Sequence, residues 1–333
     1  MNKILILILL LMTTYANAQK TVGQVVRLDP ALDALIDKDA KIEVLADGFK
    51  WSEGPVWVKK GEYLIFSDVP ANIIYKWKQS DGLSIFLKPS GYTGRGEYSR
   101  ESGSNGLTVS IDSQIIACEH GDRRVSIMPT EGGGKKTLAD NHEGKRFNSP
   151  NDVIQRQNGD VYFTDPPYGL PKQENDSTRE TDIFGVYRIA KNGTVSLAIG
   201  DLTRPNGLAF SPDEKTLYIA QSDPERAYIM AYPAIENSVL HEDGKIFFDA
   251  TPMVKQGLKG LPDGMKIDVN GNLFVTGPGG VLIISPKGKL LGRIDTGQPT
   301  ANCAWGDDGS TLYITANNLL CRIKTKTKPD VFR

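Results

Sequence analysis

A short phrase recurs along this chain, and each copy opens with an acidic or amide side chain ahead of a β-rich run. The six copies begin at Glu53, Asn105, Asn151, Asn206, Asp263 and Asn302. They are spaced roughly 40–57 residues apart, the range that is typical of propeller and solenoid repeats. Turn dipeptides such as Asn158-Gly159 and strand-like runs such as Val161–Thr164 follow most copies. The repeat therefore predicts an all-β fold, a six-bladed β-propeller.

The two ends of the chain are expected to meet and close the ring. After Asn302 the last repeat has only three strand-like runs, and a spare run, Lys41–Ala46, precedes the first copy. We expect this N-terminal strand to complete the last blade, because closure removes the exposed edges of an open sheet. One domain over residues 19–333 then accounts for the length of the chain. A Pro-led stretch, Asp29–Ile36, is expected to form a short helix before the spare strand.

The first residues have the features of a signal peptide. Lys3 precedes the apolar run 4–12, and Ala16-Asn-Ala18 supplies the small residues of a cleavage site. The apolar run is too short to span a bilayer. We therefore expect residues 1–18 to be removed, a mature start near Gln19, and a periplasmic or secreted protein with no membrane attachment.

Charge and cysteine content exclude several classes of function. The formal net charge of −1 gives no reason to expect nucleic acid or an anionic membrane as a partner, and no obligate protein partner is indicated. Cys118, Cys303 and Cys321 are an odd number for an exported chain and are expected to be buried thiols without a disulfide. No CxxC or HExxH spacing points to a zinc site.

Equivalent positions of propeller blades lie at the same depth around one axis, so the six phrase openings should converge at one end of the central channel. Glu53 and Asp263 bring carboxylates, and Asn151 and Asn206 bring amide oxygens. Hard divalent cations prefer such ligands, and Ca²⁺ tolerates an irregular polyhedron, whereas softer metals favour imidazole or thiolate. A single Asn-Gly or Asp-Gly pair is ordinarily only a turn. The shared register instead predicts a metal site made of these four residues, with Ca²⁺ favoured and Mg²⁺, Mn²⁺ or Zn²⁺ as alternatives.

Other residues are candidates for roles around this site. Those expected to contact substrate are Asn105, His120, Tyr168, Arg204 and Asn302. His120 is equally compatible with a surface position, and Tyr168 with a structural role in a turn-rich segment. Strand alternation would point the Asp152 side chain away from the metal, so Asp152 is expected to orient the metal ligands without binding the metal itself.

Several motifs resemble the gluconolactonase/regucalcin family of six-bladed propellers, over nearly the whole mature chain. They are Glu53–Trp57, Ser149–Val153, Arg204–Leu208 and Leu261–Met265, and the runs Gly103–Leu107, Cys118–Arg124, Gly144–Asp152 and Tyr162–Gly169 are most similar to bacterial secreted gluconolactonases. The resemblance implies a divalent cation on the propeller axis, held by Glu53, Asn151, Asn206 and Asp263. It implies hydrolysis of a sugar lactone to an aldonic acid.

In such a reaction the cation polarises the lactone carbonyl, and Asp263 accepts a proton from the attacking water. Asn105, His120 and Asn302 would orient the sugar hydroxyls. Two alternatives stay open. The family's relatives include phosphotriesterases of the diisopropyl fluorophosphatase type, which use a similar cage. A non-enzymatic propeller that binds a protein or peptide would have no reason to gather carboxylates on its axis.

The first testable prediction concerns export. If residues 1–18 are a cleaved signal, N-terminal sequencing of the exported protein should begin near Gln19, and its mass under non-reducing conditions should show three free thiols. Retention of Met1 would contradict the cleavage, and a mass lower by two hydrogens would reveal a disulfide.

Overall fold

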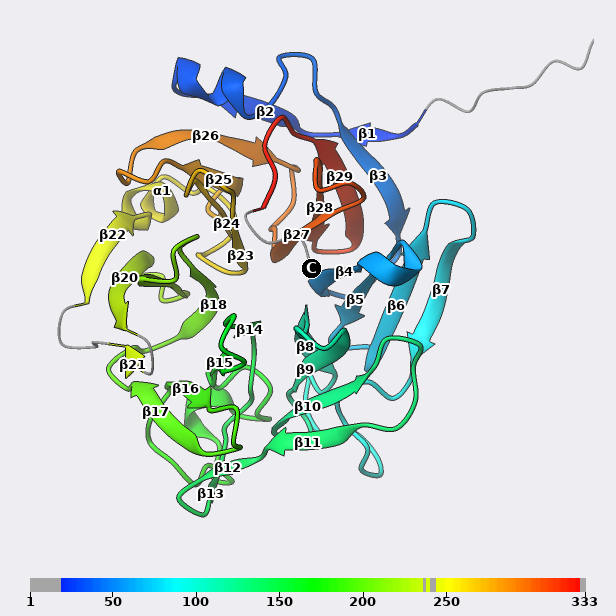
Figure 1. The fold of residues 1–333 in the computed structure, drawn as a ribbon, viewed down its shortest axis with the longest axis vertical. Helices are drawn as coiled ribbons and strands as arrows, with labels where there is room; N and C mark the ends of the chain where they lie inside the picture. The colour runs from blue at the N-terminus through cyan, green and yellow to red at the C-terminus, as the bar shows by residue number, and fades with distance from the viewer. Residues whose placement is uncertain (1–18, 236–237, 240–243, 330–333) are drawn as a thin grey trace, which may run out of the picture.

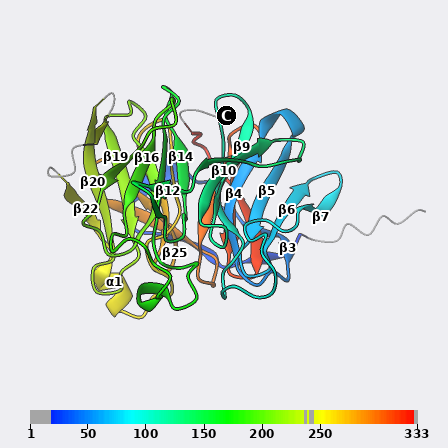
Figure 2. The same ribbon diagram turned by 90° about the horizontal axis from the view of Figure 1, so that it is seen from below.

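Six β-sheets stand radially around a central channel in the computed structural model, which describes residues 19–235, 238–239 and 244–329 (Figure 1). The expected signal peptide, residues 1–18, lies outside the described residues. Each sheet is an antiparallel meander whose innermost strand borders the channel. Seen from the side, the blades stand upright next to one another around this channel (Figure 2). The predicted six-bladed propeller is therefore confirmed.

The first three blades follow one another along the chain, with the innermost strand first. Blade 1 contains β4 (Ser52–Val58), β5 (Tyr63–Asp68), β6 (Ile73–Lys78) and β7 (Gly82–Leu87). Blade 2 contains β8 (Ser104–Val109), β9 (Gln114–Glu119), β10 (Arg124–Pro129) and β11 (Lys136–Ala139). Blade 3 contains β14 (Val153–Gln155), β15 (Val161–Thr164), β16 (Val186–Ile189) and β17 (Val195–Ile199). A small hairpin of β12 (Asn141–His142) and β13 (Lys145–Arg146) connects blades 2 and 3.

The last three blades repeat this order. Blade 4 contains β18 (Pro205–Phe210), β19 (Thr216–Gln221), β20 (Tyr228–Ile235) and β22 (Lys245–Asp249), with β21 (Ser238–Val239) paired to the end of β20. Blade 5 contains β23 (Met265–Ile267), β24 (Leu273–Gly277), β25 (Gly280–Ile284) and β26 (Leu290–Asp295). Blade 6 contains β27 (Asn302–Gly306), β28 (Thr311–Ala316) and β29 (Leu319–Lys324).

Burial decreases from the channel outwards because the inner strands are packed between neighbouring blades. Every residue of β5 is buried, whereas β7, at the outer edge of the same blade, is largely exposed. Helices are few and short: α1 (Thr251–Lys255) and the 3₁₀ turns η1 (Pro30–Ala34), η2 (Lys59–Gly61) and η3 (Gln173–Asn175). Within the described ranges, no helix is long and apolar enough to cross a bilayer.

The N-terminal segment closes the ring as predicted. β3 (Ile42–Asp47) pairs antiparallel with β29, with Val44 opposite Cys321, and so supplies the fourth strand of blade 6. Two shorter strands were not predicted. β1 (Thr21–Val22) adds outside β3, and β2 (Gln24–Arg27) pairs with β26 of blade 5. The N-terminal segment thus joins blades 5 and 6.

The expected helix after Asp29 is a single 3₁₀ turn. The Asp29 carboxylate accepts a hydrogen bond from the Ala31 N–H at 2.8 Å, which caps the turn, and Leu32 is fully buried in the core beneath it. The three cysteines are free and buried, as expected, in the part of the chain that is described.

If β3 holds the ring closed, shortening its buried side chains should destabilise the whole protein. Ile42 is 2% exposed and packs in the core shared by blades 5 and 6. Ile42→Ala should lower the free energy of unfolding in urea by about 2–5 kcal/mol. The matched control is Glu43→Ala on the same strand, which removes a partly exposed ion pair with Arg322 and should cost about 1 kcal/mol or less. Equal losses for the two variants would contradict the closure role of β3.

Candidate active site at the oxygen ring

The six phrase openings lie at the same end of the channel, and we call them the oxygen ring. The ring consists of Glu53, Asn105, Asn151, Asn206, Asp263 and Asn302. Four of these residues lie in the first residues of β4, β8, β18 and β27, and the other two lie two residues before β14 and β23. Five of the six are between 2% and 6% exposed, whereas Asp263 keeps partial exposure. Asp263 is therefore the ring carboxylate that solvent reaches best.

The glycine that follows several ring residues has a packing reason. A Cβ at Gly54 would lie 2.0 Å from the Asn105 carbonyl oxygen, and one at Gly264 would lie 1.9 Å from Cγ of Asn302. In both cases the obstacle is the ring residue of the next blade. The glycine therefore lets neighbouring inner strands approach closely, which brings the oxygen-bearing side chains together, and the pair is not simply turn chemistry.

The amides of the ring form a chain of hydrogen bonds. Asn105 Nδ2 donates to Asn151 Oδ1 at 2.7 Å, and Asn151 Nδ2 donates to Asn206 Oδ1 at 2.6 Å. Asn206 Nδ2 donates in turn to the Ser222 hydroxyl at 3.1 Å, and that hydroxyl donates to the Pro262 carbonyl. The oxygens of Asn151 and Asn206 each accept one of these bonds and have a second lone pair, so they can still serve as ligands.

The ring carboxylates are held in surroundings that disfavour their charge. Burial raises the pKa of Glu53 to about 8, and the nearby Asp152 carboxylate adds to the rise, while the Gly54 N–H opposes it by donating at 2.8 Å. Burial also raises the pKa of Asp263, together with repulsion from Glu53 and Asp152. Without a positive partner, these carboxyl groups favour the protonated state.

Asp152 lies closer to the ring than strand alternation suggested. Asn302 Nδ2 donates to its Oδ2 at 3.3 Å, across the channel, and Asp152 is 4% exposed. β14 begins only at Val153, so Asp152 precedes the regular strand and strand alternation does not fix the direction of its side chain. The contact with Asn302 is compatible with the expected part of Asp152 in orienting ring residues. Its place in the phrase is the glycine position, and its Oδ1 packs over Gly106. Burial raises the pKa of Asp152 as well.

His120 directly follows β9 and is fully buried, so the surface alternative is excluded. Its Nδ1 lies 3.0 Å from the Glu101 carbonyl, which can only accept, so Nδ1 carries the proton. Its Nε2 is then the lone-pair nitrogen, which can accept from Asn105 Nδ2 at 3.4 Å but cannot donate to Asn151 Oδ1, 3.2 Å away. Burial lowers the pKa of His120 and favours this neutral form.

Tyr168 and Arg204 border the same end of the channel. The Tyr168 hydroxyl is buried with no hydrogen-bond partner, and its pKa is raised by burial and by the charge of Asp263. Arg204 donates to Glu174 in η3 at 2.5 Å, and its charge also acts on Tyr168. Arg204 is thus paired with a protein carboxylate, while Tyr168 has a free hydroxyl near the ring.

Two residues of the site were not predicted individually. Glu101 lies in the segment between β7 and β8, and its charge acts on both Glu53 and Asp263. Ser222 follows β19 and ends the amide chain. Glu101 could have been noticed as an acidic residue four positions before Asn105, but nothing in the repeat marks Ser222.

The donor set of the ring fits a hard cation. Within the described ranges, no three His, Cys, Asp or Glu side chains gather at metal-binding distance, so any cation here would rely on amide oxygens beside the two carboxylates. Carboxylate and amide oxygens are the ligands that Ca²⁺ accepts in irregular numbers. A cation would also offset the repulsion between the buried carboxylates.

The raised pKa of Glu53 predicts a pH dependence of stability in the presence of chelator. The folded-state pKa, about 8, is above the reference value of 4.5, so the folded protein binds an extra proton between these values. This contribution to stability is fully present below about pH 4.5 and is lost as the pH rises through about 8. Glu53→Gln should remove it and flatten the slope by up to about 1.4 kcal/mol per pH unit.

The measurement is urea unfolding of wild type and Glu53→Gln at several pH values. Asp165, whose pKa is raised to about 7 by burial, contributes in both proteins and cancels in the difference. Parallel curves for the two proteins would show that Glu53 is charged in the folded, metal-free state.

Comparison with known proteins agrees with this fold. Residues 51–318 match the family described as the SMP-30/Gluconolactonase/LRE-like region. A gluconolactonase of Zymomonas mobilis is 44% identical over 318 residues, which cover 92% of this chain and 87% of that protein. The solved structure of a gluconolactonase from Xanthomonas campestris has a TM-score of 0.77 at 30% identity and covers 92% and 98% of the two chains.

A more distant structure shares the fold. It is the calcium-binding protein regucalcin from Agrobacterium tumefaciens, with a TM-score of 0.67 at 20% identity over 87% of this chain and 96% of that one. The match of the family model to most of the chain, together with the extent of the Zymomonas similarity, shows that this protein belongs to the SMP-30/gluconolactonase family.

Proposed function

We propose that this protein hydrolyses a sugar lactone of the gluconolactone type to the aldonic acid, with a divalent cation at the oxygen ring. The observation that carries the proposal is the gathering of Glu53 and Asp263 with amide oxygens on the axis, in a chain 44% identical to a gluconolactonase. We propose Glu53, Asn151, Asn206 and Asp263 as the ligands and Ca²⁺ as the favoured ion, with Mg²⁺, Mn²⁺ or Zn²⁺ as alternatives.

A bound cation would supply Lewis-acid polarisation of the lactone carbonyl and stabilise the negative charge that develops there. The chain's own residues bind and orient the substrate. The Tyr168 hydroxyl is a donor at this end of the channel, and the Asn105 amide and His120 Nε2 would exchange their long mutual contact of 3.4 Å for contacts with sugar hydroxyls. Donors and acceptors of this kind suit a polyhydroxylated ring.

Asp263 is the proposed acceptor of the proton from the attacking water. It is the ring carboxylate with partial exposure, whereas Glu53 is 2% exposed. A base must lie within reach of the water whose proton it takes. His120, whose neutral Nε2 lies beside the ring, and Asp152 are the next candidates.

The phosphotriesterase alternative would use the same ring with a more apolar surround. This end of the channel is instead polar, which favours a sugar lactone. Its polar groups are Glu101, His120, Tyr168 and the Arg204–Glu174 pair.

We propose that the protein acts in the periplasm or outside the cell, on the basis of its signal-like N-terminus.

The reaction class is tested by assaying purified protein on a panel of aldonolactones and phosphotriesters, with and without chelator. We expect lactone hydrolysis that chelator abolishes and added Ca²⁺ restores. Turnover of phosphotriesters alone would favour the alternative. Lactone hydrolysis that is insensitive to chelator would contradict the role of the cation.

The roles within the ring are tested by two matched variants. Asp263→Asn keeps an oxygen ligand of similar size and removes the base, so turnover at saturating Ca²⁺ should fall by about 10²-fold or more. Asn206→Asp keeps the oxygen and adds charge, so it should bind metal at least as well and lose less activity, because extra negative charge weakens the Lewis acid. Near-normal turnover of Asp263→Asn at saturating Ca²⁺ would restrict Asp263 to a ligand role.

A further inference from the structure

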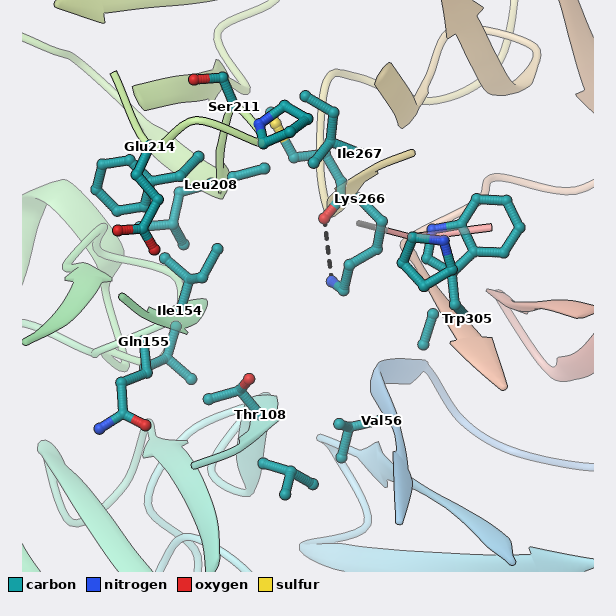
Figure 3. A pocket seen from close by; sticks show the side chains of 18 of the residues that line it. Val56, Thr108, Ile154, Gln155, Leu208, Ser211, Glu214, Lys266, Ile267 and Trp305 are labelled. Atoms are coloured by element: carbon teal, nitrogen blue, oxygen red, sulfur yellow. Dashed lines mark hydrogen bonds between the residues drawn. The ribbon is translucent and has the colours of Figure 1, made fainter. Parts of the chain in front are cut away.

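A cavity opens at the end of the channel opposite the oxygen ring. Three residues beyond each ring member, the six inner strands contribute a second ring: Val56, Thr108, Ile154, Ala209, Lys266 and Trp305. Three residues of extended strand span about 10 Å, so the two rings are separate levels of one channel. Figure 3 shows the side chains around the open centre.

The second ring has three apolar side chains, Val56, Ile154 and Ala209, beside Thr108, Trp305 and one cation, Lys266. Lys266 is partly exposed and extends into the opening, where its Nζ donates to the carbonyl of Met265 at 3.0 Å (Figure 3). Glu214 also lines the cavity, but it is paired with Arg156 at 3.3 Å and accepts from the Gln157 N–H. Another charged group near Lys266 is Asp152, which lies on the side of the oxygen ring. The charge of Lys266 acts on Asp152, but the two side chains form no ion pair.

A second donor at this level has no acceptor. Trp305 is 6% exposed, lines the cavity, and has a buried indole N–H without a hydrogen-bond partner. Leaving such a donor unpaired is costly, so its presence at a cavity suggests a missing acceptor. Neutral polar side chains also line the cavity. Gln155 is engaged through both its oxygen and its nitrogen, and the Ser211 hydroxyl donates to Asp213 and accepts from the Thr216 N–H.

We propose that this cavity binds a small monocarboxylate with an apolar body, such as an aromatic or branched aliphatic acid. The carboxylate would accept from the Lys266 ammonium and the Trp305 indole, and its body would lie against Val56, Ile154 and Leu208. The cavity volume is about 190 Å³, and an apolar cavity of about 150 Å³ already holds a benzene ring. The apolar walls favour an acid with an apolar body over a polyhydroxylated one, and none of the oxygen-ring residues lines this cavity, so the site is distinct from the proposed lactone site.

The test uses benzoate as the probe, with the full chain in chelator so that no cation at the oxygen ring can bind the carboxylate. Isothermal titration calorimetry should show one benzoate per chain, with much weaker binding of benzyl alcohol, which has no charge, and of acetate, which has no ring. Lys266→Met keeps the side-chain length and should weaken benzoate binding by about tenfold or more. Trp305→Phe removes the indole donor and should weaken it by a smaller factor.

Two controls locate the site. Lys245→Met removes an exposed lysine on the outer strand β22, and Asp263→Asn alters the oxygen ring; both should bind benzoate as wild type does. Circular dichroism checks that each variant is folded. The proposal is overturned if wild type binds no benzoate at about 10 mM, if Lys266→Met binds it equally well, or if Asp263→Asn rather than Lys266→Met abolishes binding.

Discussion

The pairing of β3 with β29 is the constraint on which the site depends, because it presses blade 6 against blade 1. Ser52, the residue before Glu53, donates from its hydroxyl to the carbonyl of Leu319 at 2.8 Å. Trp57 stacks on Tyr313 with ring centroids 5.6 Å apart across the same junction. The position of the first ring carboxylate is thus set by strands from both ends of the chain, and an open ring would leave Glu53 without its neighbours in blade 6.

The oxygen ring could be predicted from the sequence because propeller symmetry converts a repeated phrase into a shared depth. The number of blades, the closing strand and all six ring positions follow from that single pattern. Contacts that obey no repeat could not be predicted in this way. β1 and β2 are too short to carry a periodic signal, and Ser222 belongs to none of the repeated phrases. Asp152 precedes β14, so strand alternation does not predict the direction of its side chain.

The two levels of the channel show how one set of strands supports different chemistry. Carboxylates and amides gather at one level, where burial raises the pKa of Glu53 and Asp263 and leaves them in need of a positive partner. Three residues further along, Lys266 and the Trp305 indole N–H lie beside apolar side chains and, in our proposal, donate to a carboxylate. The same register that aligns the first level also aligns the second.

The amides of the oxygen ring are linked to one another by hydrogen bonds. The amide chain from Asn105 through Asn206 to Ser222 fixes these side chains before any ligand binds, which reduces the cost of organising a site. The buried carboxylates are the strained part of the arrangement, and a divalent cation would offset their mutual repulsion.

The most direct test of this account is a crystal structure of the protein grown with Mn²⁺ or Ca²⁺ and measured for anomalous scattering. The account predicts one strong anomalous peak on the channel axis, at about 2.1–2.6 Å from oxygens of Glu53, Asn151, Asn206 and Asp263. A map without a peak at the oxygen ring, or with the metal held by other residues, would contradict it.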